Sequence, residues 1–280
     1  MDTEIDGISN HSKNKYPLFD LGLQLTAEQK AFFDQNGFIH FKNFITRETV
    51  SRIHQEMEKI QNKWIAEDVK LVNGVPIKYG TNTDGRKIVQ RFAFSNQHSV
   101  FLSELLKDPR LKALFEFIGT PDCRIGETEK DGLVINHYVN SENSTFAQMG
   151  WHTDALRDIF YGQKIMPMLN VGIHLDNSST DNGGLRLLPG THNQNLYNML
   201  FKKWYFYEKT PDKNEIGLNV DAGDLTVHDG RLWHRVALSP FVGEKSRRRV
   251  MYVPIITGKY QPKSSESKPL FYQRFIANYK

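Results

Sequence analysis

Cysteine is nearly absent from this chain of 280 residues, which contains Cys123 and no other. A single cysteine excludes an internal disulfide and any metal site built from several thiolates. Cys123 stands in Pro-Asp-Cys-Arg without a local partner that would activate it, so we assign it a structural role. The scarcity of cysteine also fits a reducing compartment, and we expect a cytoplasmic protein.

Long apolar runs and an excess of one charge are missing as well. No stretch approaches the ~20 apolar residues of a membrane-spanning helix, and the polar N-terminus MDTEIDGISNHSKNKYP has no apolar run. The 36 Lys and Arg residues are interleaved with 32 Asp and Glu residues, which gives a net charge of +4. We therefore expect neither a nucleic-acid nor a membrane partner, but a small-molecule substrate.

The second half of the chain consists of short runs typical of β-strands. Turn residues separate these runs, and this pattern favours a sandwich or barrel over β-α-β units. We expect a mainly β fold with flanking helices, specifically a double-stranded β-helix (jelly roll) of the cupin type. The predicted strands are 132–139, 168–175, 184–188, 217–220, 224–228, 233–238 and 248–256.

The N-terminal part has a more helical pattern. Thr26 begins a capping box, and the helix that follows should end at Gly37. A second helix from Thr46 repeats apolar residues at three and four positions, which predicts one buried face. We expect one domain over 1–280, divided into a polar arm (1–24), a mainly helical buttress (25–122), a jelly-roll core (123–257) and a C-terminal tail (258–280).

The stretch Trp151-His152-Thr153-Asp154 is the strongest candidate for chemistry. In an extended segment, His152 and Asp154 project to the same side and can reach one metal ion. A second histidine would complete a 2-His-1-carboxylate site, the usual ligand set for non-haem iron(II) in oxygenases. The sequence contains one more His-x-Asp triplet, His174-Leu175-Asp176, which we interpret as a polar strand end.

The remaining ligand should come from a later strand. His228 and His234 are the candidates, and a turn at Asp229-Gly230 between them suggests that only one faces the pocket of His152. We favour His234, with His228 as the alternative. Four predicted strands lie between His152 and the run that holds His234, whereas a start from His174 would leave the roll short of strands.

Three consecutive arginines, Arg247, Arg248 and Arg249, open the last predicted strand. Because side chains alternate along a strand, all three cannot point outward. An inward arginine beside an iron site can bind a carboxylate through two hydrogen bonds. This is what a dicarboxylic co-substrate requires at its far end.

Several motifs together resemble the phytanoyl-CoA dioxygenase-like family of iron(II)- and 2-oxoglutarate-dependent oxygenases. The similarity extends over roughly 25–256, and its most specific stretch, Asn-Gly-Gly-Leu-Arg-x-Leu-Pro-Gly-Thr-His, has no metal role of its own. The motifs are Glu28 to Phe41, Leu133 to Asn136, Trp151 to Asp154, Asn182 to His192, and Gly223 to His234 with the arginine strand after it.

The resemblance implies roles for individual residues. It implies that His152, Asp154 and His234 bind Fe(II). It places the arginine for the C5 carboxylate of 2-oxoglutarate at Arg248, and it places Asn136 on a strand near the co-substrate. A strand asparagine that bonds to a loop is an equal alternative for Asn136.

The choice among the arginines stays open in the sequence. Arg248 is preferred because Val250 then falls where the family has a small apolar residue. The interval of 14 positions from His234 to Arg248 is longer than the family's usual one, which keeps Arg247 and Arg249 as alternatives.

The expected function follows from these residues and the resemblance. We expect hydroxylation of a small metabolite, such as an amino acid or a natural-product intermediate, with O2 and 2-oxoglutarate consumed and succinate and CO2 released. The presence of Asp154 favours hydroxylation or a related oxidation over halogenation. The substrate walls should come from 88–94, 155–168 and 193–216, and Arg157 is a candidate contact for an anionic substrate. The alternatives are a cupin-type metal enzyme that does not use 2-oxoglutarate and a roll that binds a ligand without turnover.

Overall fold

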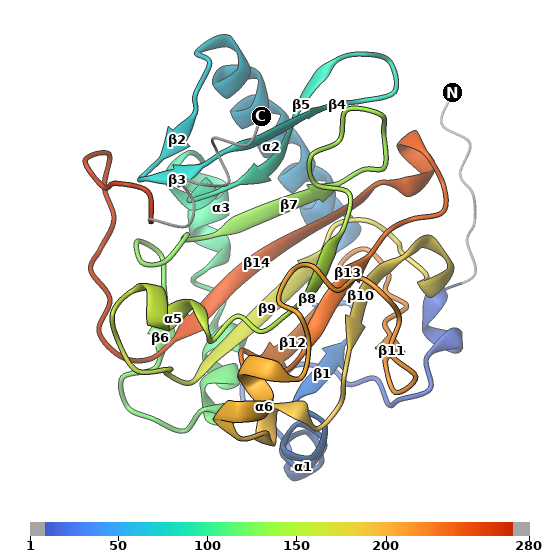
Figure 1. The fold of residues 1–280 in the computed structure, drawn as a ribbon, viewed down its shortest axis with the longest axis vertical. Coiled ribbons are helices and arrows are strands. Elements are labelled where there is room, and N and C mark those ends of the chain that lie inside the picture. Colours follow the sequence, from blue (N-terminus) through green and yellow to red (C-terminus); the bar gives the residue numbers. More distant parts are fainter. Residues whose placement is uncertain (1–8, 271–280) are drawn as a thin grey trace.

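The computed structural model describes residues 9–270, and two antiparallel sheets dominate it (Figure 1). The larger sheet has the order β1-β12-β9-β14-β7-β5-β4 with β6 paired to β14, and the smaller has the order β11-β10-β13-β8. A short β2-β3 ladder stands apart. The strands are β1 Phe38–Phe41, β2 Leu71–Val72, β3 Val75–Pro76, β4 Lys78–Thr81, β5 Lys87–Phe92, β6 Arg124–Ile125, β7 Val134–Tyr138, β8 Met149–His152, β9 Met168–His174, β10 Gly184–Leu187, β11 Ile216–Gly217, β12 Leu225–Asp229, β13 His234–Ala237 and β14 Arg248–Ile256.

The larger sheet is buried on both faces, and β9 shows why. Leu169, Val171 and Ile173 point to one side, where they pack in the main hydrophobic core. Asn170 and His174 alternate with them and point to the interior between the two sheets. The strand therefore contributes apolar residues to the core and polar residues to the interior of the roll.

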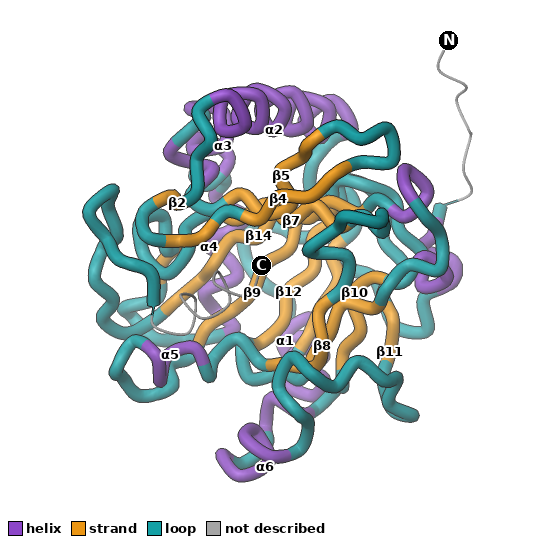
Figure 2. Tube along the Cα trace, turned by 45° about the horizontal axis from the view of Figure 1, so that its top comes forward, coloured by secondary structure: helices purple, strands orange, loops and turns teal. Residues whose placement is uncertain are grey.

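Helices cover the outer face of the larger sheet (Figure 2). The capping box at Thr26 is present, and Gly37 ends α1 in the left-handed conformation at φ 75°. The predicted apolar stripe of α2 is buried and runs from Val50 to Trp64. The helices are α1 Ala27–Asn36, α2 Arg47–Ala66, α3 Val100–Leu105, α4 Pro109–Ala113, α5 Arg157–Phe160 and α6 Leu196–Phe201.

The double-stranded β-helix expected from the sequence is confirmed, and each strand predicted after Cys123 has a counterpart. Within the region 25–122, β1, β4 and β5 join the larger sheet beside the helices. Among residues 9–270, the structure contains no helix that is both long and apolar enough to cross a bilayer. The arrangement leaves an interior between the two sheets, and the polar residues predicted for the site line it.

Candidate metal centre

The smaller sheet brings the predicted ligands together. His152 is the last residue of β8 and pairs directly with His234, the first residue of β13. Asp154 follows two residues after β8. One ligand atom from each of these three side chains lies within 4.8 Å of the others. The histidine and the aspartate, separated by one residue, therefore lie close enough to share one metal ion, as expected from the sequence.

Backbone carbonyls hold both imidazoles in one orientation. His152 Nδ1 lies 2.8 Å from the Gly150 carbonyl, and His234 Nδ1 lies 3.0 Å from the Leu232 carbonyl. Each Nδ1 then carries the proton and donates it, which leaves the Nε2 lone pair free for a metal. Burial lowers the pKa of both histidines, so the neutral form needed by a metal ligand is favoured.

Asp154 completes the set as an ionised carboxylate. Asn170 Nδ2 donates to Asp154 Oδ2 at 2.8 Å and fixes its orientation. The 3.5 Å between Asp154 Oδ2 and His234 Nε2 suits two ligands that each lie roughly 2.0–2.2 Å from one divalent ion, the distances known for zinc.

Asn170 is a residue that the sequence interpretation missed. The signal for it is a polar residue on the inward face of a strand whose outward neighbours, Leu169 and Val171, are apolar. A polar residue at such a position needs a partner inside the roll. That partner is Asp154.

His228, the alternative ligand, also points to the interior. Its Nε2 lies 3.6 Å from Asp154 Oδ2 and makes no hydrogen bond among residues 9–270. The expectation that only one of the two histidines faces the pocket is therefore wrong. The turn after β12 carries the chain from the larger sheet to the smaller one, and the facing surfaces of the two sheets both line the interior. His234 belongs to the group whose ligand atoms converge with those of His152 and Asp154.

The second His-x-Asp triplet does not form a metal pair. His174 Nε2 lies 3.0 Å from Thr226 Oγ1. Asp176 accepts two hydrogen bonds from the Arg249 guanidinium at 2.9 and 2.6 Å. The two side chains of the triplet have separate partners.

The three consecutive arginines point in different directions. Arg247 pairs with Glu244 on the surface, and Arg249 pairs with Asp176. Arg248 is 3% exposed and points into the roll, as the alternation along the strand requires. The structure thus brings one of the three arginines to the interior.

Arg248 lines a narrow cavity between the sheets together with Tyr138, Val236 and Tyr252. Its Nη1 donates to the Ala237 carbonyl at 2.9 Å, while its buried Nε has no hydrogen-bond partner among the described residues. Burial lowers the pKa of Arg248 to about 10, so the side chain keeps its charge at neutral pH. A buried guanidinium with an unused donor suits a carboxylate ligand.

Asn136 lies on β7 and also faces the interior. Its Oδ1 accepts from Arg91 Nη1 at 3.1 Å, and its Nδ2 donates to the Tyr138 hydroxyl at 3.1 Å. The ring of Tyr138 lies 5.8 Å from the Arg248 guanidinium. Asn136 therefore connects Arg91 to the cavity that holds Arg248.

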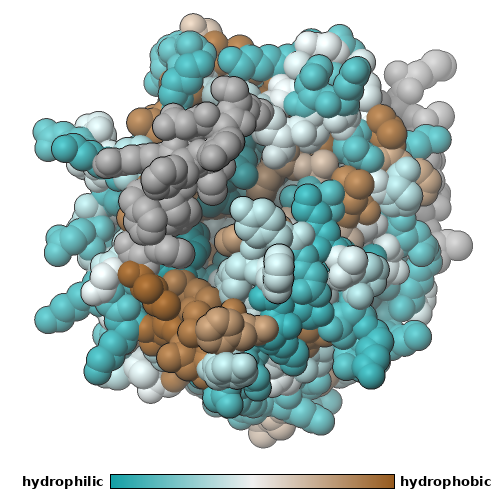
Figure 3. Space-filling model, in the orientation of Figure 1, coloured by the Kyte–Doolittle hydropathy of each residue, from teal (hydrophilic) through white to brown (hydrophobic). Residues whose placement is uncertain are grey.

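Segment 205–208, in which three aromatic residues precede Glu208, packs on the edge of β8, and we call it the aromatic segment. The amide of Phe206 donates to the Trp151 carbonyl at 2.9 Å, and its ring stacks on His152 with centroids 4.9 Å apart. A Cβ on Gly150 would lie 2.3 Å from the Phe206 carbonyl oxygen, so glycine permits this close approach. In Figure 3, apolar side chains gather over α5 and α6, where Ile159 and Phe201 are exposed.

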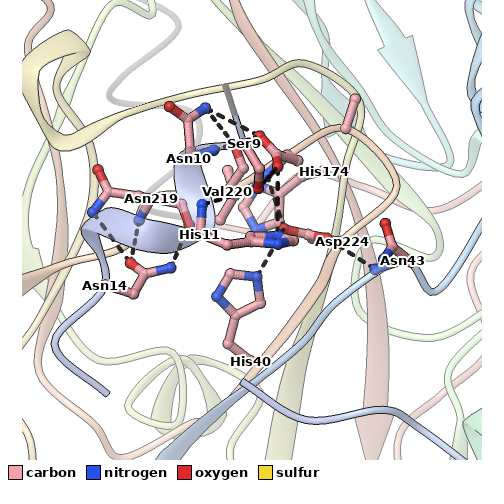
Figure 4. A network of polar contacts seen from close by, with 12 residues as sticks. Ser9, Asn10, His11, Asn14, His40, Asn43, His174, Asn219, Val220 and Asp224 are labelled. Atoms are coloured by element: carbon pink, nitrogen blue, oxygen red, sulfur yellow. Dashed lines mark hydrogen bonds and ion pairs between the residues drawn. The ribbon is translucent and has the colours of Figure 1, made fainter. Parts of the chain in front are cut away.

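A second histidine and aspartate cluster, formed by His11, His40 and Asp224, lies elsewhere in the fold (Figure 4). Asp224 Oδ2 is 2.6 Å from His11 Nε2, 2.9 Å from His40 Nε2 and 2.8 Å from the amide of Asp221. Its other oxygen accepts from the amide of Asn43 at 2.9 Å. Because three donors surround Asp224 Oδ2, we interpret the cluster as a hydrogen-bonded anchor that holds residues 9–14 against the fold.

Replacing Asp224 by asparagine should lower the free energy of unfolding by about 3–5 kcal/mol, because the buried histidine loses its charged partner. Burial opposes ionisation, but the His40 hydrogen bond holds the pKa of Asp224 well below its usual value. The carboxylate therefore stabilises the fold above about pH 4, and the contribution is lost as pH falls. Urea unfolding should show a difference between wild type and Asp224→Asn that is constant near neutrality and shrinks in acid. Asp20→Asn, at an exposed aspartate, is the control and should change stability little; equal effects of both substitutions would refute the anchor.

Several curated proteins are similar to this chain at low sequence identity. The peroxisomal phytanoyl-CoA dioxygenase of Rattus norvegicus is 24% identical over 224 residues, which cover 75% of this chain and 63% of that protein. The ectoine dioxygenase of Nocardia farcinica is 22% identical over 224 residues, which cover 79% of this chain and 67% of that protein. The chain spans 51% to 67% of the length of its curated relatives.

Solved structures share the fold. HygX from Streptomyces hygroscopicus, crystallised with nickel and 2-oxoglutarate, superposes with a TM-score of 0.59 at 16% identity, covering 85% of this chain and 89% of that one. A model of the phytanoyl-CoA dioxygenase (PhyH) family matches residues 33–238, well over half of the sequence. This match confirms the resemblance found in the motifs. The chain belongs to the phytanoyl-CoA dioxygenase family.

Proposed function

We propose that this protein is an Fe(II)- and 2-oxoglutarate-dependent oxygenase that hydroxylates a small-molecule metabolite. The observation that carries the proposal is the convergence of His152, Asp154 and His234 on one point inside the roll. Two neutral imidazoles and one carboxylate leave open coordination positions, the arrangement used by non-haem iron oxygenases. Family membership supports the same reaction class.

The iron would be held by His152 Nε2, His234 Nε2 and the Asp154 carboxylate. Each ligand has its own support, since carbonyls fix both imidazoles and Asn170 fixes the carboxylate. Such supporting bonds hold ligand orientation and tune affinity. When bound, iron and 2-oxoglutarate supply the oxidising chemistry, in which the co-substrate and O2 are converted to succinate, CO2 and an oxidised product.

Arg248 would bind the C5 carboxylate of 2-oxoglutarate. It is the buried arginine of the three, its Nε is available, and Tyr138 and Tyr252 enclose it. Asn136 would contribute a polar contact near the co-substrate, although its present bonds to Arg91 and Tyr138 also fit a purely structural role. Burial of the cavity lining limits access of water and strengthens the ion pair with the co-substrate.

The substrate would approach from the side of α5 and the aromatic segment 205–208. Phe206 is stacked on His152 and still half exposed, so it can contact both a ligand and a bound molecule. The exposed apolar surface beside it fits a substrate with an apolar portion.

We further propose that 1–280 acts as one oxygenase domain and that the protein lies in the cytoplasm. The low cysteine content supports the cytoplasmic location.

The proposal is tested by incubating the full chain with Fe(II), 2-oxoglutarate and O2 across a library of amino acids and natural-product intermediates. Succinate release above the substrate-free rate identifies a substrate and supports the proposal. Substrate oxidation that continues without 2-oxoglutarate would instead favour a cupin-type metal enzyme. Ligand binding with no turnover of any member would favour a non-catalytic roll.

A further inference from the structure

Three cationic side chains converge on one buried carboxylate beside the candidate metal centre. Arg91 Nη2 and Arg157 Nη2 each donate to Asp131 Oδ2 at 2.7 Å, and Lys263 Nζ lies 3.8 Å from Asp131 Oδ1. We call these four residues the Asp131 cluster. They come from four separate parts of the chain, namely β5, the loop before β7, α5 and the segment after β14.

In the Asp131 cluster, three cationic side chains surround a single carboxylate. The side chain of Asp131 is only 5% exposed. Burial raises the pKa of Asp131, but Arg157, Arg91 and Lys263 hold it well below its usual value. Burial also lowers the pKa of Lys263. Partly desolvated positive charge of this kind attracts an anion more strongly than exposed charge does.

Two contacts connect the Asp131 cluster to the site. Arg91 donates its Nη1 to Asn136, which faces the roll interior. Arg157 lies three residues after Asp154, and its amide donates to the Asp154 carbonyl at 3.2 Å.

The Asp131 cluster is separate from Arg248. Asn136 and Tyr138 lie two residues apart on β7, which is about 7 Å along the strand. Arg91 contacts Asn136, whereas Arg248 lies over the Tyr138 ring. Arg91 therefore lies at one end of the Asn136–Tyr138 stretch of β7, and Arg248 lies at the other. If Arg248 holds a carboxylate of 2-oxoglutarate, the Asp131 cluster remains available for a different ligand.

We propose that the Asp131 cluster binds an oxyanion of the substrate, through the guanidinium groups of Arg91 and Arg157. The inference rests on the proposed function and narrows it to substrates that carry a carboxylate, phosphate or sulfate group. The side chains of Arg91 and Arg157 are 18% and 25% exposed, so each presents some surface to a ligand while Asp131 holds it in place. Planar guanidinium groups bind such oxyanions through paired hydrogen bonds.

Anion binding can be measured without turnover. The full chain is loaded with Fe(II) and 2-oxoglutarate under nitrogen, so that Arg248 is occupied, and titrated with sulfate or acetate at constant ionic strength in KCl. The midpoint of thermal unfolding reports binding, because a ligand of the folded state raises it. Sulfate represents a tetrahedral dianion and acetate a carboxylate, and the stronger response identifies the class of oxyanion.

Arg91→Gln and Arg157→Gln should each weaken the response about tenfold, as expected for loss of a charge-assisted hydrogen bond. Arg157→Lys should recover part of it. The matched control is Arg52→Gln, at an arginine on the outer helix α2 that stacks on Phe101, and it should respond like wild type. A purely structural role would lower the unfolding temperature of the variants while leaving the response to anions intact, which would overturn the proposal.

Two further measurements distinguish a failure of this inference from a failure of the proposed function. The KM for 2-oxoglutarate should stay unchanged in Arg157→Gln; a rise in that KM with an unaltered sulfate and acetate response would assign the Asp131 cluster to the co-substrate and overturn the proposal. In the succinate assay, acidic library members should be turned over faster than their methyl esters, and Arg157→Gln should remove the difference. Turnover with no preference for acids would overturn the inference and leave the oxygenase assignment intact.

Discussion

His234→Ala is expected to abolish tight iron binding and 2-oxoglutarate-dependent succinate formation, whereas His228→Ala is expected to keep both. Loss of an outer partner of a metal ligand already costs 10–100-fold in affinity, so loss of the ligand itself should cost more than about 100-fold. The two histidines are a matched pair. Both are buried in the same interior and lie 3.5 and 3.6 Å from Asp154 Oδ2.

Comparing the two variants distinguishes the histidine that binds iron from the one that only lies beside it. Iron content after anaerobic loading and desalting, with circular dichroism to confirm folding, is the measurement. Full iron content in His234→Ala together with iron loss in His228→Ala would show that β12, and not β13, supplies the ligand. Asp154→Ala should behave as His234→Ala does.

The second large effect concerns the co-substrate. Arg248→Ala should raise the KM for 2-oxoglutarate by about 100-fold, since truncating one partner of a buried charge pair costs roughly 2–5 kcal/mol. Iron binding should be nearly unchanged, because Arg248 contacts none of the three proposed ligands and instead donates to the Ala237 carbonyl. Initial rates of succinate release against 2-oxoglutarate concentration give the result.

Arg249→Ala is the control for this prediction. Its guanidinium is already held by the Asp176 carboxylate, at 2.6 Å, so it is not available for a second carboxylate in the way that the Arg248 guanidinium is. The substitution should therefore leave the KM near the wild-type value. A large rise in KM confined to Arg249→Ala would show that the wrong arginine had been assigned.

The sequence predicted those features whose causes are local. Alternation along an extended segment placed His152 and Asp154 on one side, and the same alternation required one arginine of three to face inward. The capping box at Thr26 fixed the start of α1 because its bonds join residues three positions apart. Each of these depends on neighbours in the chain, so a pattern in the sequence can report it.

Contacts between distant segments were not predicted. The Asp131 cluster joins Arg91 to Asp131 across 40 positions and adds Lys263 from the far end of the chain. The polar arm predicted over 1–24 is bound to Asn219 through Asn14, 205 positions away. Local periodicity carries no signal for such pairs, because they depend on how the sheets close. The expectation about His228 failed for the same reason.

The most direct test is a crystal structure of the full chain grown under nitrogen with Fe(II) and 2-oxoglutarate, in which anomalous scattering locates the iron. We predict a strong peak bonded to His152 Nε2, His234 Nε2 and a carboxylate oxygen of Asp154, with the far carboxylate of 2-oxoglutarate on Arg248. Iron bound instead at His11, His40 and Asp224, or absent from the interior of the roll, would contradict the account.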